Sequence, residues 1–407
     1  MHTEHVETVI IGGGQAGLAM SHHLRQLGQE HVMLERGRVA ERWREHWDSL
    51  CFQGPNWNVR LPGFALQTDQ PDAYATRDDI VRFIESYAGF INAPLRCGVT
   101  VNSLRQGPDS KQLVLETSAG RLHAKNVIVA TGPFQKPAAP TPIESRAWQL
   151  HSSEYRNPDL LPSGAVLVIG SGNSGCQIAE ELCAAGRRVY LSVSSYQGTP
   201  RRYRGKDCVW WLWNLGDVES TVDQRRPSRL MSGVGGGHDL DPRRLAADGV
   251  VLLGRVLGGV DGKLAIDSDL SEKLARGDDY AVNLMRRADD YATRHGLDLP
   301  AHNGCIAQLP EPKEVANPLF TLDLHAAGVT SIIWANGFRH DFNWIDLPVF
   351  ADAGLSNRAP VQRRGITSVR GLYFVGLHWM HKFKSAFLAG VGEDAEHLAA
   401  HIAGDRG

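Results

Sequence analysis

The sequence predicts an α/β protein that contains two Rossmann-like dinucleotide-binding domains. Two glycine-rich turns lead to this prediction: one follows an apolar strand in VIIGGGQAGLAM, and the other follows an apolar strand in VLVIGSGNSGCQIAEEL. Each turn opens a segment of helical periodicity, as in a βαβ unit. The chain has 407 residues, which is enough for two or three domains rather than one.

The first turn has the spacing Gly12-x-Gly14-x-x-Gly17. Gly12 permits a tight turn, Gly14 lets a pyrophosphate approach the backbone, and Gly17 lets the helix pack on the sheet. The following strand, HVMLE, ends at Glu35, in the position of a carboxylate that binds a ribose 2′-hydroxyl. We therefore expect a cofactor with a free 2′-hydroxyl, which is true of both FAD and NAD.

The second turn repeats the spacing as Gly170-x-Gly172-x-x-Gly175 but lacks the acid. The corresponding strand, RRVYLSV, runs into serines, and the chain continues through Arg201 and Arg202. A carboxylate would repel a 2′-phosphate, whereas a guanidinium can pair with it. The sequence thus predicts NADPH rather than NADH at this turn, although the same arginines would also suit a solvated surface.

The pair of turns identifies the first cofactor. Two nicotinamide cofactors in one chain would have no evident chemistry with each other. NADPH beside a flavin can pass it a hydride. FAD is therefore the cofactor expected at the first turn.

Composition argues against several other classes of protein. The net charge of −2 gives no indication of nucleic-acid binding. The six cysteines form no C-x-x-C pair and have no zinc-ligand spacing, so we expect reduced thiols and no bound metal. The N-terminus has no secretory pattern, and no apolar run reaches the about 20 residues that span a bilayer. These features predict a cytoplasmic protein with no membrane partner.

Five further stretches are typical of one family. They are RWREHWDSLCF, VIVATGPF, QLHSSEYRNP, IIWANGFRHDFNWI and LYFVGLHWMHKFKSAFLAGVGEDAEHLAAHI. With them the chain resembles, over nearly its whole length, the single-component FAD- and NADPH-dependent flavin-containing monooxygenases, in a bacterial, class B-like branch. It departs from the family pattern at Ser145 and Ala147, where Phe and Gly are usual, and at Asn336, where Thr is usual.

The resemblance implies that the NADPH domain is inserted in the FAD domain. The expected boundaries are 1–160 for the first part of the FAD domain, 161–328 for the NADPH domain and 329–407 for the second part. The implied cycle is reduction of FAD by NADPH, addition of dioxygen at flavin C4a, and transfer of one oxygen atom from the (hydro)peroxide to a small organic substrate at N or S. The alternatives are Baeyer–Villiger-type oxygenation, oxidative decarboxylation of a carbonyl substrate, and an NADPH oxidase or dehydrogenase without oxygen transfer.

The turns and the resemblance together give the expected site residues. FAD is expected to contact Gly12, Gly14, Gln15, Ala16, Gly17, Glu35, Arg36, Trp43, Val101, Ala130, Thr131, Gly132 and Gly376. NADPH is expected to contact Gly170, Gly172, Asn173, Ser174, Gly175, Arg201 and Arg202. The neutral amides expected to hold the oxygenated flavin are those of Asn56, Asn58 and Asn173. The first two would equally suit a turn beside Pro55.

The sequence leaves open the roles of several residues and two other classes of protein. Trp210, Trp211 and Trp213 could line a substrate channel, lie on a membrane surface or fill a domain interface. His378 and His381 could transfer protons beside the flavin or be buried structural histidines. A disulfide reductase would need a cysteine pair near the flavin, and a redox sensor would bind the dinucleotides without catalysis. Dioxygen and a small molecule are the expected partners, and a homodimer is the commonest oligomer.

Overall fold

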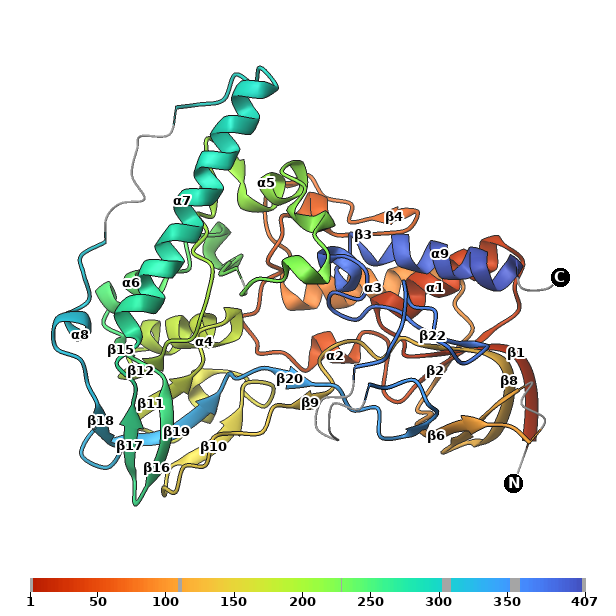
Figure 1. Ribbon diagram of the computed structural model, residues 1–407, viewed down its shortest axis with the longest axis horizontal. Coiled ribbons are helices and arrows are strands. Elements are labelled where there is room, and N and C mark those ends of the chain that lie inside the picture. The colour runs from red at the N-terminus through yellow and green to blue at the C-terminus, as the bar shows by residue number, and fades with distance from the viewer. Residues whose placement is uncertain (1–2, 109–111, 228, 302–308, 352–358, 405–407) are drawn as a thin grey trace.

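The computed structural model describes residues 3–108, 112–227, 229–301, 309–351 and 359–404. Figure 1 shows two lobes side by side, each built around a sheet with helices on it. Cys305 lies outside the described residues. Within the described ranges, no helix has both the length and the apolar character that crossing a bilayer requires.

The first lobe contains an eight-stranded sheet in the order β21-β6-β7-β8-β1-β2-β5, with β22 paired to β8. Strands β1, β2, β5 and β22 run parallel to β8, and β7 forms antiparallel pairs with β6 and β8. The strands are β1 (Thr3–Ile11), β2 (Val32–Glu35), β5 (Leu95–Cys97), β6 (Val101–Gln106), β7 (Leu113–Thr117), β8 (Gly120–Val129), β21 (Ile345–Asp346) and β22 (Leu372–Phe374).

Helices α1 (Gln15–Gln26), α3 (Arg77–Phe90) and α9 (Val391–Gly404) pack together on this sheet (Figure 1). The side chains of β1 alternate between the two faces, so that Ile10 joins the core under the helices and Val9 and Ile11 join the core of the opposite face. Helix α3 begins where the sequence predicts, because Thr76 and Asp79 form a reciprocal capping box.

The second lobe contains a five-stranded, entirely parallel sheet in the order β10-β19-β11-β12-β15. Its strands are β10 (Trp148–His151), β11 (Ala165–Ile169), β12 (Val189–Ser192), β15 (Val251–Leu253) and β19 (Val329–Trp334). Helix α4 (Asn173–Ala184) joins β11 to β12. Helix α6 (Pro242–Ala247) precedes β15, and the long helix α7 (Leu270–Arg294) rises from this lobe in Figure 1.

The strand pairing places both domain boundaries at other residues than those expected. β10, expected in the first part of the FAD domain, and β19, expected in its second part, both belong to the second sheet. The inserted lobe therefore runs from β10 to β19. Strands β9 (Lys136–Pro137) and β20 (Phe338–Arg339) pair with each other where the chain passes between the lobes.

The remaining elements are short and lie outside the two main sheets. Helix α5 (Cys208–Asn214) carries the three neighbouring tryptophans, and Trp211 is fully buried against Tyr203 and Tyr291, so it packs in a core within the inserted lobe. The other elements are α2 (Glu41–Arg44), η1 (Asn56–Asn58), β3 (Arg60–Leu61), β4 (Phe64–Ala65), η2 (Pro158–Leu160), β13 (Arg202–Tyr203), β14 (Lys206–Asp207), η3 (Asp217–Glu219), η4 (Val222–Gln224), η5 (Val234–Gly236), β16 (Val256–Val260), β17 (Lys263–Ile266), α8 (Lys313–Ala316), β18 (Thr321–Asp323) and η6 (Phe383–Ala386).

Candidate active site

The first glycine turn joins β1 to α1 with the geometry that the sequence predicts. Gly12 has φ +119°, and a Cβ atom there would lie 2.5 Å from the carbonyl oxygen of Ala130. A Cβ on Gly17 would lie 2.0 Å from the carbonyl oxygen of Gly12, so the helix could not pack this closely with any other residue. A Cβ on Gly14 would meet nothing within 4 Å. This open space is where a pyrophosphate can approach the backbone.

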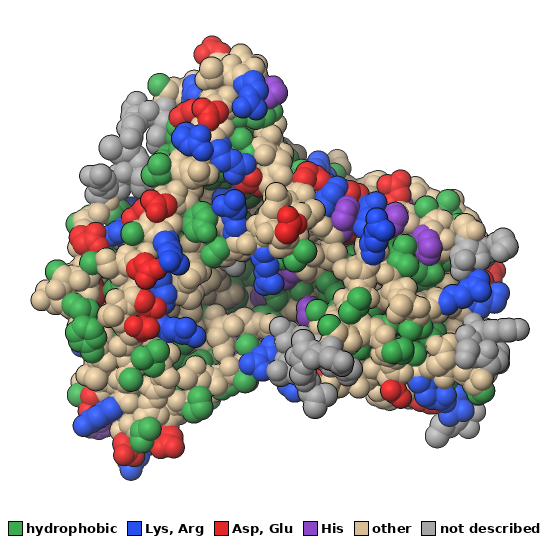
Figure 2. All heavy atoms as spheres, in the orientation of Figure 1, with side chains coloured by type: hydrophobic (Ala, Val, Ile, Leu, Met, Phe, Trp, Pro, Cys, Tyr) green, Lys and Arg blue, Asp and Glu red, His purple; other side chains and the backbone are tan. Residues whose placement is uncertain are grey.

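A cavity of about 370 Å³, here named the first cavity, opens at this turn. Figure 2 shows that the molecule is hollowed between the two lobes. All residues expected to contact FAD line the first cavity except Gly17, which lies behind it: Gly12, Gly14, Gln15, Ala16, Glu35, Arg36, Trp43, Val101, Ala130, Thr131, Gly132 and Gly376. These residues come from six separate stretches that the fold brings together.

The Glu35 carboxylate is fixed on the wall of the first cavity. It accepts hydrogen bonds from the backbone N–H groups of Gly13 (2.7 Å) and Gly37 (2.8 Å). Gln15 performs a similar role further along the wall, because it accepts from Trp43 Nε1 (3.1 Å) and donates to the Ala386 carbonyl (2.8 Å). The first turn is thereby braced against η6 from the other end of the chain.

Arg42 also lines the first cavity, a position that was not predicted from the sequence. Its Nη1 donates to Glu45 (2.8 Å), and its Cζ lies 4.8 Å from the centre of the Phe338 ring. Its Nε and Nη2 are buried and have no hydrogen-bond partner among the described residues. Because buried donors are costly when unpaired, this cavity wall fits an anionic or carbonyl-rich group such as FAD.

Two histidines on the cavity wall are held neutral. His378 is accessible from the cavity but surrounded by protein, and burial, with contributions from Arg225 and His340, lowers its pKa to about 4. Burial likewise lowers the pKa of His46 to about 4, with contributions from the charges of Arg42 and two other arginines. At neutral pH both imidazoles can therefore donate or accept a hydrogen bond without adding charge.

The second turn, between β11 and α4, repeats the geometry of the first. Gly170 has φ +108°, and a Cβ atom there would lie 2.5 Å from the carbonyl oxygen of Ala335. A Cβ on Gly175 would lie 1.7 Å from the carbonyl oxygen of Gly170, and one on Gly172 would meet nothing within 4 Å. Ser174 stands in the first turn of α4, whose N-terminus faces a bound pyrophosphate in this motif.

The structure corrects the prediction for Arg201. Its side chain is only 2% exposed and forms an ion pair with Asp207 at 2.6 Å. Its Nη1 donates to the Gln53 carbonyl, and its guanidinium lies 4.7 Å from the Tyr74 ring. Arg201 is thus a structural residue that cannot turn toward a 2′-phosphate. Arg202 is exposed and donates to the Gly236 carbonyl at 3.4 Å.

A different cation lies where the second strand of this unit ends. Lys273, on α7, donates from Nζ to the carbonyl oxygen of Val193 at 2.9 Å and pairs with Asp269 at 2.5 Å. Val193, directly after β12, has the position in this βαβ unit that Glu35 has in the first unit. Nothing in the local sequence indicates Lys273, because it follows Val193 by 80 residues.

None of the three predicted catalytic amides lines the first cavity. Asn173 donates to the Arg229 carbonyl (2.8 Å) and accepts from Met231 N–H (2.8 Å), so its amide holds that segment, and its catalytic role stays a prediction. Asn56 and Asn58 are buried in η1, and Asn56 donates to the Gln70 carbonyl. Neither lines the first cavity, and the Oδ1 atom of each has no partner among the described residues.

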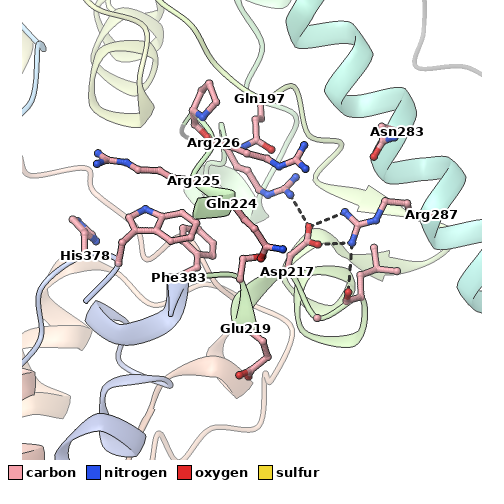
Figure 3. A pocket seen from close by; sticks show the side chains of 16 residues that line it. Gln197, Asp217, Glu219, Gln224, Arg225, Arg226, Asn283, Arg287, His378 and Phe383 are labelled. Atoms are coloured by element: carbon pink, nitrogen blue, oxygen red, sulfur yellow. Dashed lines mark hydrogen bonds and ion pairs between the residues drawn. The ribbon is translucent and has the colours of Figure 1, made fainter. Parts of the chain in front are cut away.

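A second cavity, of about 540 Å³, shares His378 with the first. It is lined by η3, residues 224–227, Arg229, α7 and the 378–383 segment. Figure 3 shows Arg287 and Asp217 paired at one end and His378 and Phe383 at the other. The second cavity thus extends from the inserted lobe to the wall of the first cavity.

The described cysteines are free thiols. Burial raises the pKa of Cys208 to about 12 and the pKa of Cys176 well above its usual value. A thiol that stays protonated is a poor nucleophile. Within the described part of the chain, no group of three or more His, Cys, Asp or Glu side chains could hold a metal ion.

Two dinucleotide turns on two sheets, the first opening into a cavity that fits FAD, define a flavoprotein oxidoreductase with sites for FAD and NADPH. The chain belongs to the pyridine nucleotide-disulphide oxidoreductase family, whose model matches residues 9–213. The two-domain fold and the resemblance inferred from the sequence are both confirmed.

The chain is also similar to individual proteins in sequence and in structure. It is 32% identical over 405 residues to an uncharacterized oxidoreductase, CzcO-like, of Geobacillus kaustophilus, which covers 98% of each chain. It is 32% identical over 202 residues to the indole-3-pyruvate monooxygenase YUCCA8 of Oryza sativa, across 46% of this chain and 48% of that one. The flavin-containing monooxygenase from Stenotrophomonas maltophilia has the same fold, with a TM-score of 0.67 at 18% identity over 99% of this chain and 100% of that one.

Proposed function

We propose that this chain is a flavoprotein monooxygenase that uses NADPH and dioxygen to oxygenate a small organic substrate at nitrogen or sulfur. The observation that carries the proposal is the lining of the first cavity, which includes no cysteine among the described residues, in a chain with a second dinucleotide turn. A disulfide reductase needs a reactive cysteine pair against its flavin. The monooxygenase names of two relatives support the same class.

FAD, when bound, accepts a hydride and activates dioxygen, and the chain positions it. The free Nε and Nη2 atoms of Arg42 are donors that stabilise negative charge on the cofactor. Glu35 holds the ribose end. Gln15, through Trp43 and Ala386, keeps the wall of the first cavity closed on the side of η6.

The same wall also limits water and charge near the reacting atoms. Phe134 lines the first cavity, and its ring lies 5.2 Å from those of Phe338 and His378 in edge-to-face contacts. A dry surrounding favours oxygen transfer over loss of peroxide. The lowered pKa of His378 keeps it uncharged at neutral pH, so it can serve as a hydrogen-bond partner without attracting water as an imidazolium would.

The preference for NADPH is assigned to Lys273 in place of Arg201. Its ammonium group lies at the strand end where the first unit has Glu35, and no carboxylate occupies that strand position in the second unit. A positive charge there pairs with a 2′-phosphate. Asp269 holds the ammonium in the absence of that phosphate.

The function is tested by reducing the oxidised holoenzyme anaerobically with NADPH, and separately with NADH, and then mixing it with oxygenated buffer while the flavin spectrum is recorded. Rapid bleaching by NADPH is expected, followed by a slow return through a spectrum that differs from those of oxidised and reduced flavin. Product analysis with a tertiary amine and a thioether should then give the N-oxide or S-oxide. Immediate reoxidation with stoichiometric hydrogen peroxide and no oxygenated product would instead identify an oxidase. Oxygen insertion beside a carbonyl would move the reaction to the Baeyer–Villiger type.

A further inference from the structure

The second cavity contains more positive charge than the function proposed so far uses. Four arginines line it: Arg225, Arg226, Arg229 and Arg287. Arg229 and Arg287 both pair with Asp217, at 2.6 Å for Arg229. The other acid in the lining, Glu219, pairs with Lys382 and Lys384. Both acids are therefore already neutralised.

Arg225 and Arg226 are exposed and have no acidic partner among the described residues. The two side chains extend toward different ends of the second cavity. In Figure 3, Arg225 lies at the end occupied by His378 and Phe383, whereas Arg226 extends toward Gln197. Arg225 is thus the unpaired charge at the boundary of the first cavity.

Arg225 also lies close enough to two histidines at this boundary to act on their charge. Burial, and then the charge of Arg225, lower the pKa of His378 to about 4. The same two causes lower the pKa of His340. A guanidinium that acts on both imidazoles lies within electrostatic range of the wall that the flavin would contact.

The wall beside Arg225 is aromatic. Trp379 lines the second cavity and its ring lies 4.9 Å from that of Phe383. The backbone of Trp379 has φ +56°, a left-handed conformation that bulky side chains rarely adopt. Such strain costs about 1–3 kcal/mol and is retained mainly at binding and catalytic sites. The fold therefore holds an indole ring at this place at a cost to its own stability.

We propose that Arg225 binds the carboxylate of the substrate, and that Trp379 and Phe383 contact its apolar body, so that the enzyme acts on aromatic or other apolar organic acids. The proposal rests on the monooxygenase function and narrows its substrate class. A carboxylate held by Arg225 leaves the rest of a small molecule within reach of His378 and the first cavity. A neutral amine or thioether of the same shape would leave Arg225 unpaired.

Binding to the oxidised holoenzyme tests the proposal without turnover. Phenylacetate and its neutral analogue phenylacetamide are titrated while the flavin absorbance and the tryptophan fluorescence are recorded. The wild-type protein should bind phenylacetate at least about tenfold more tightly, the effect of one charge-assisted contact. Arg225→Gln should abolish this preference, and Arg225→Lys should retain part of it. Arg276→Gln, on the outer face of α7 and paired with Glu272, is the matched control and should leave it unchanged.

The phosphates of NADPH are the other anions that could reach this cavity. The dissociation constant of NADP⁺ is therefore measured for the same variants. If Arg225→Gln weakens the binding of NADP⁺ and leaves the preference for phenylacetate over phenylacetamide unchanged, Arg225 binds the dinucleotide and the proposal is wrong. Equal binding of phenylacetate and phenylacetamide by the wild-type protein would also overturn it. These titrations need neither NADPH nor dioxygen, so they remain interpretable even if no oxygenated product is ever found.

Discussion

Arg201 illustrates how a single residue can match a functional pattern and have a structural role. It follows β12 by the short loop in which a phosphate-binding arginine was expected. The β13–β14 hairpin, however, returns the chain so that Asp207 faces it from six residues further on. Asp207 is itself only 9% exposed and also accepts a hydrogen bond from Tyr74. A buried charge pair of this kind is strongly coupled.

We predict that Arg201→Gln lowers the free energy of unfolding by about 3–5 kcal/mol, because it leaves the Asp207 carboxylate buried without its cation. Urea unfolding followed by circular dichroism measures the change. Arg202→Gln, an exposed neighbour, should change stability by no more than about 0.5 kcal/mol. A stable Arg201→Gln protein with weakened NADPH binding would restore the role that the sequence suggested.

His46 gives a prediction of pH dependence. Its pKa is about 4 in the folded chain, whereas an unfolded histidine has about 6.5. Between these values the unfolded state binds a proton that the folded state does not, so stability falls as the pH drops from 6.5 toward 4. His46→Gln should reduce this loss by about 1–3 kcal/mol between pH 7 and pH 4.5, as measured by urea unfolding at both pH values. The exposed His325→Gln is the control, and an equal reduction in both variants would contradict the assignment.

At the scale of the element, the glycines of the first turn differ in whether the fold or a ligand requires them. Gly12 and Gly17 are required by backbone atoms that lie too close for a side chain. Gly14 is different, because its φ of −89° suits any residue and a Cβ would touch no protein atom. Only a ligand in the first cavity explains why this position is kept free.

Gly14→Ala should therefore fold normally but bind FAD at least about tenfold more weakly, since its methyl group enters the space of the pyrophosphate. The ratio of flavin to protein absorbance after dialysis measures the loss, and circular dichroism checks the fold. Gly89→Ala, at an open position in α3, is the matched control and should gain up to about 1 kcal/mol of stability with unchanged flavin content. Full flavin content in Gly14→Ala would place the pyrophosphate elsewhere.

The elements that the sequence predicted correctly are those defined by local chemistry. Glycine spacing, strand and helix periodicity and the Thr76 capping box are all contained within about 20 residues. The sheet to which β10 and β19 belong could not be predicted, because it depends on the pairing of β19 with both β10 and β11, which are distant in sequence. Arg42 and Lys273 could not be predicted for a similar reason, since only the packed structure brings Arg42 to the first cavity and Lys273 to the Val193 carbonyl.

At the scale of the whole molecule, the two lobes are joined beside the second cavity by a network of ion pairs. Glu219 of η3, in the inserted lobe, pairs with Lys382 and Lys384 of the first lobe. Both lysines also pair with Glu393 of α9. The N–H group of Phe383 donates to the Ser220 carbonyl at 2.8 Å, and Trp213 lies between the cations of Arg60 and Lys384. This junction lies beside the second cavity, because Glu219, Ser220 and Phe383 also line that cavity.

Under the proposed function, exclusion of water from the bound flavin depends on the two lobes staying together. Loss of the junction should therefore appear first as leakage of peroxide rather than as loss of flavin reduction. Glu219→Gln removes the charge that ties η3 to both lysines, while Glu393 still pairs with each of them. A partly exposed pair of this kind contributes about 0.5–1 kcal/mol, so the open population should rise about two- to fivefold. We predict a similar rise in hydrogen peroxide released per NADPH consumed, with the rate of anaerobic flavin reduction unchanged. Glu272→Gln, which breaks an exposed pair on α7 away from the junction, should leave the peroxide yield as it is. If Glu219→Gln slows reduction and leaves the peroxide yield constant, the junction positions NADPH instead of excluding water.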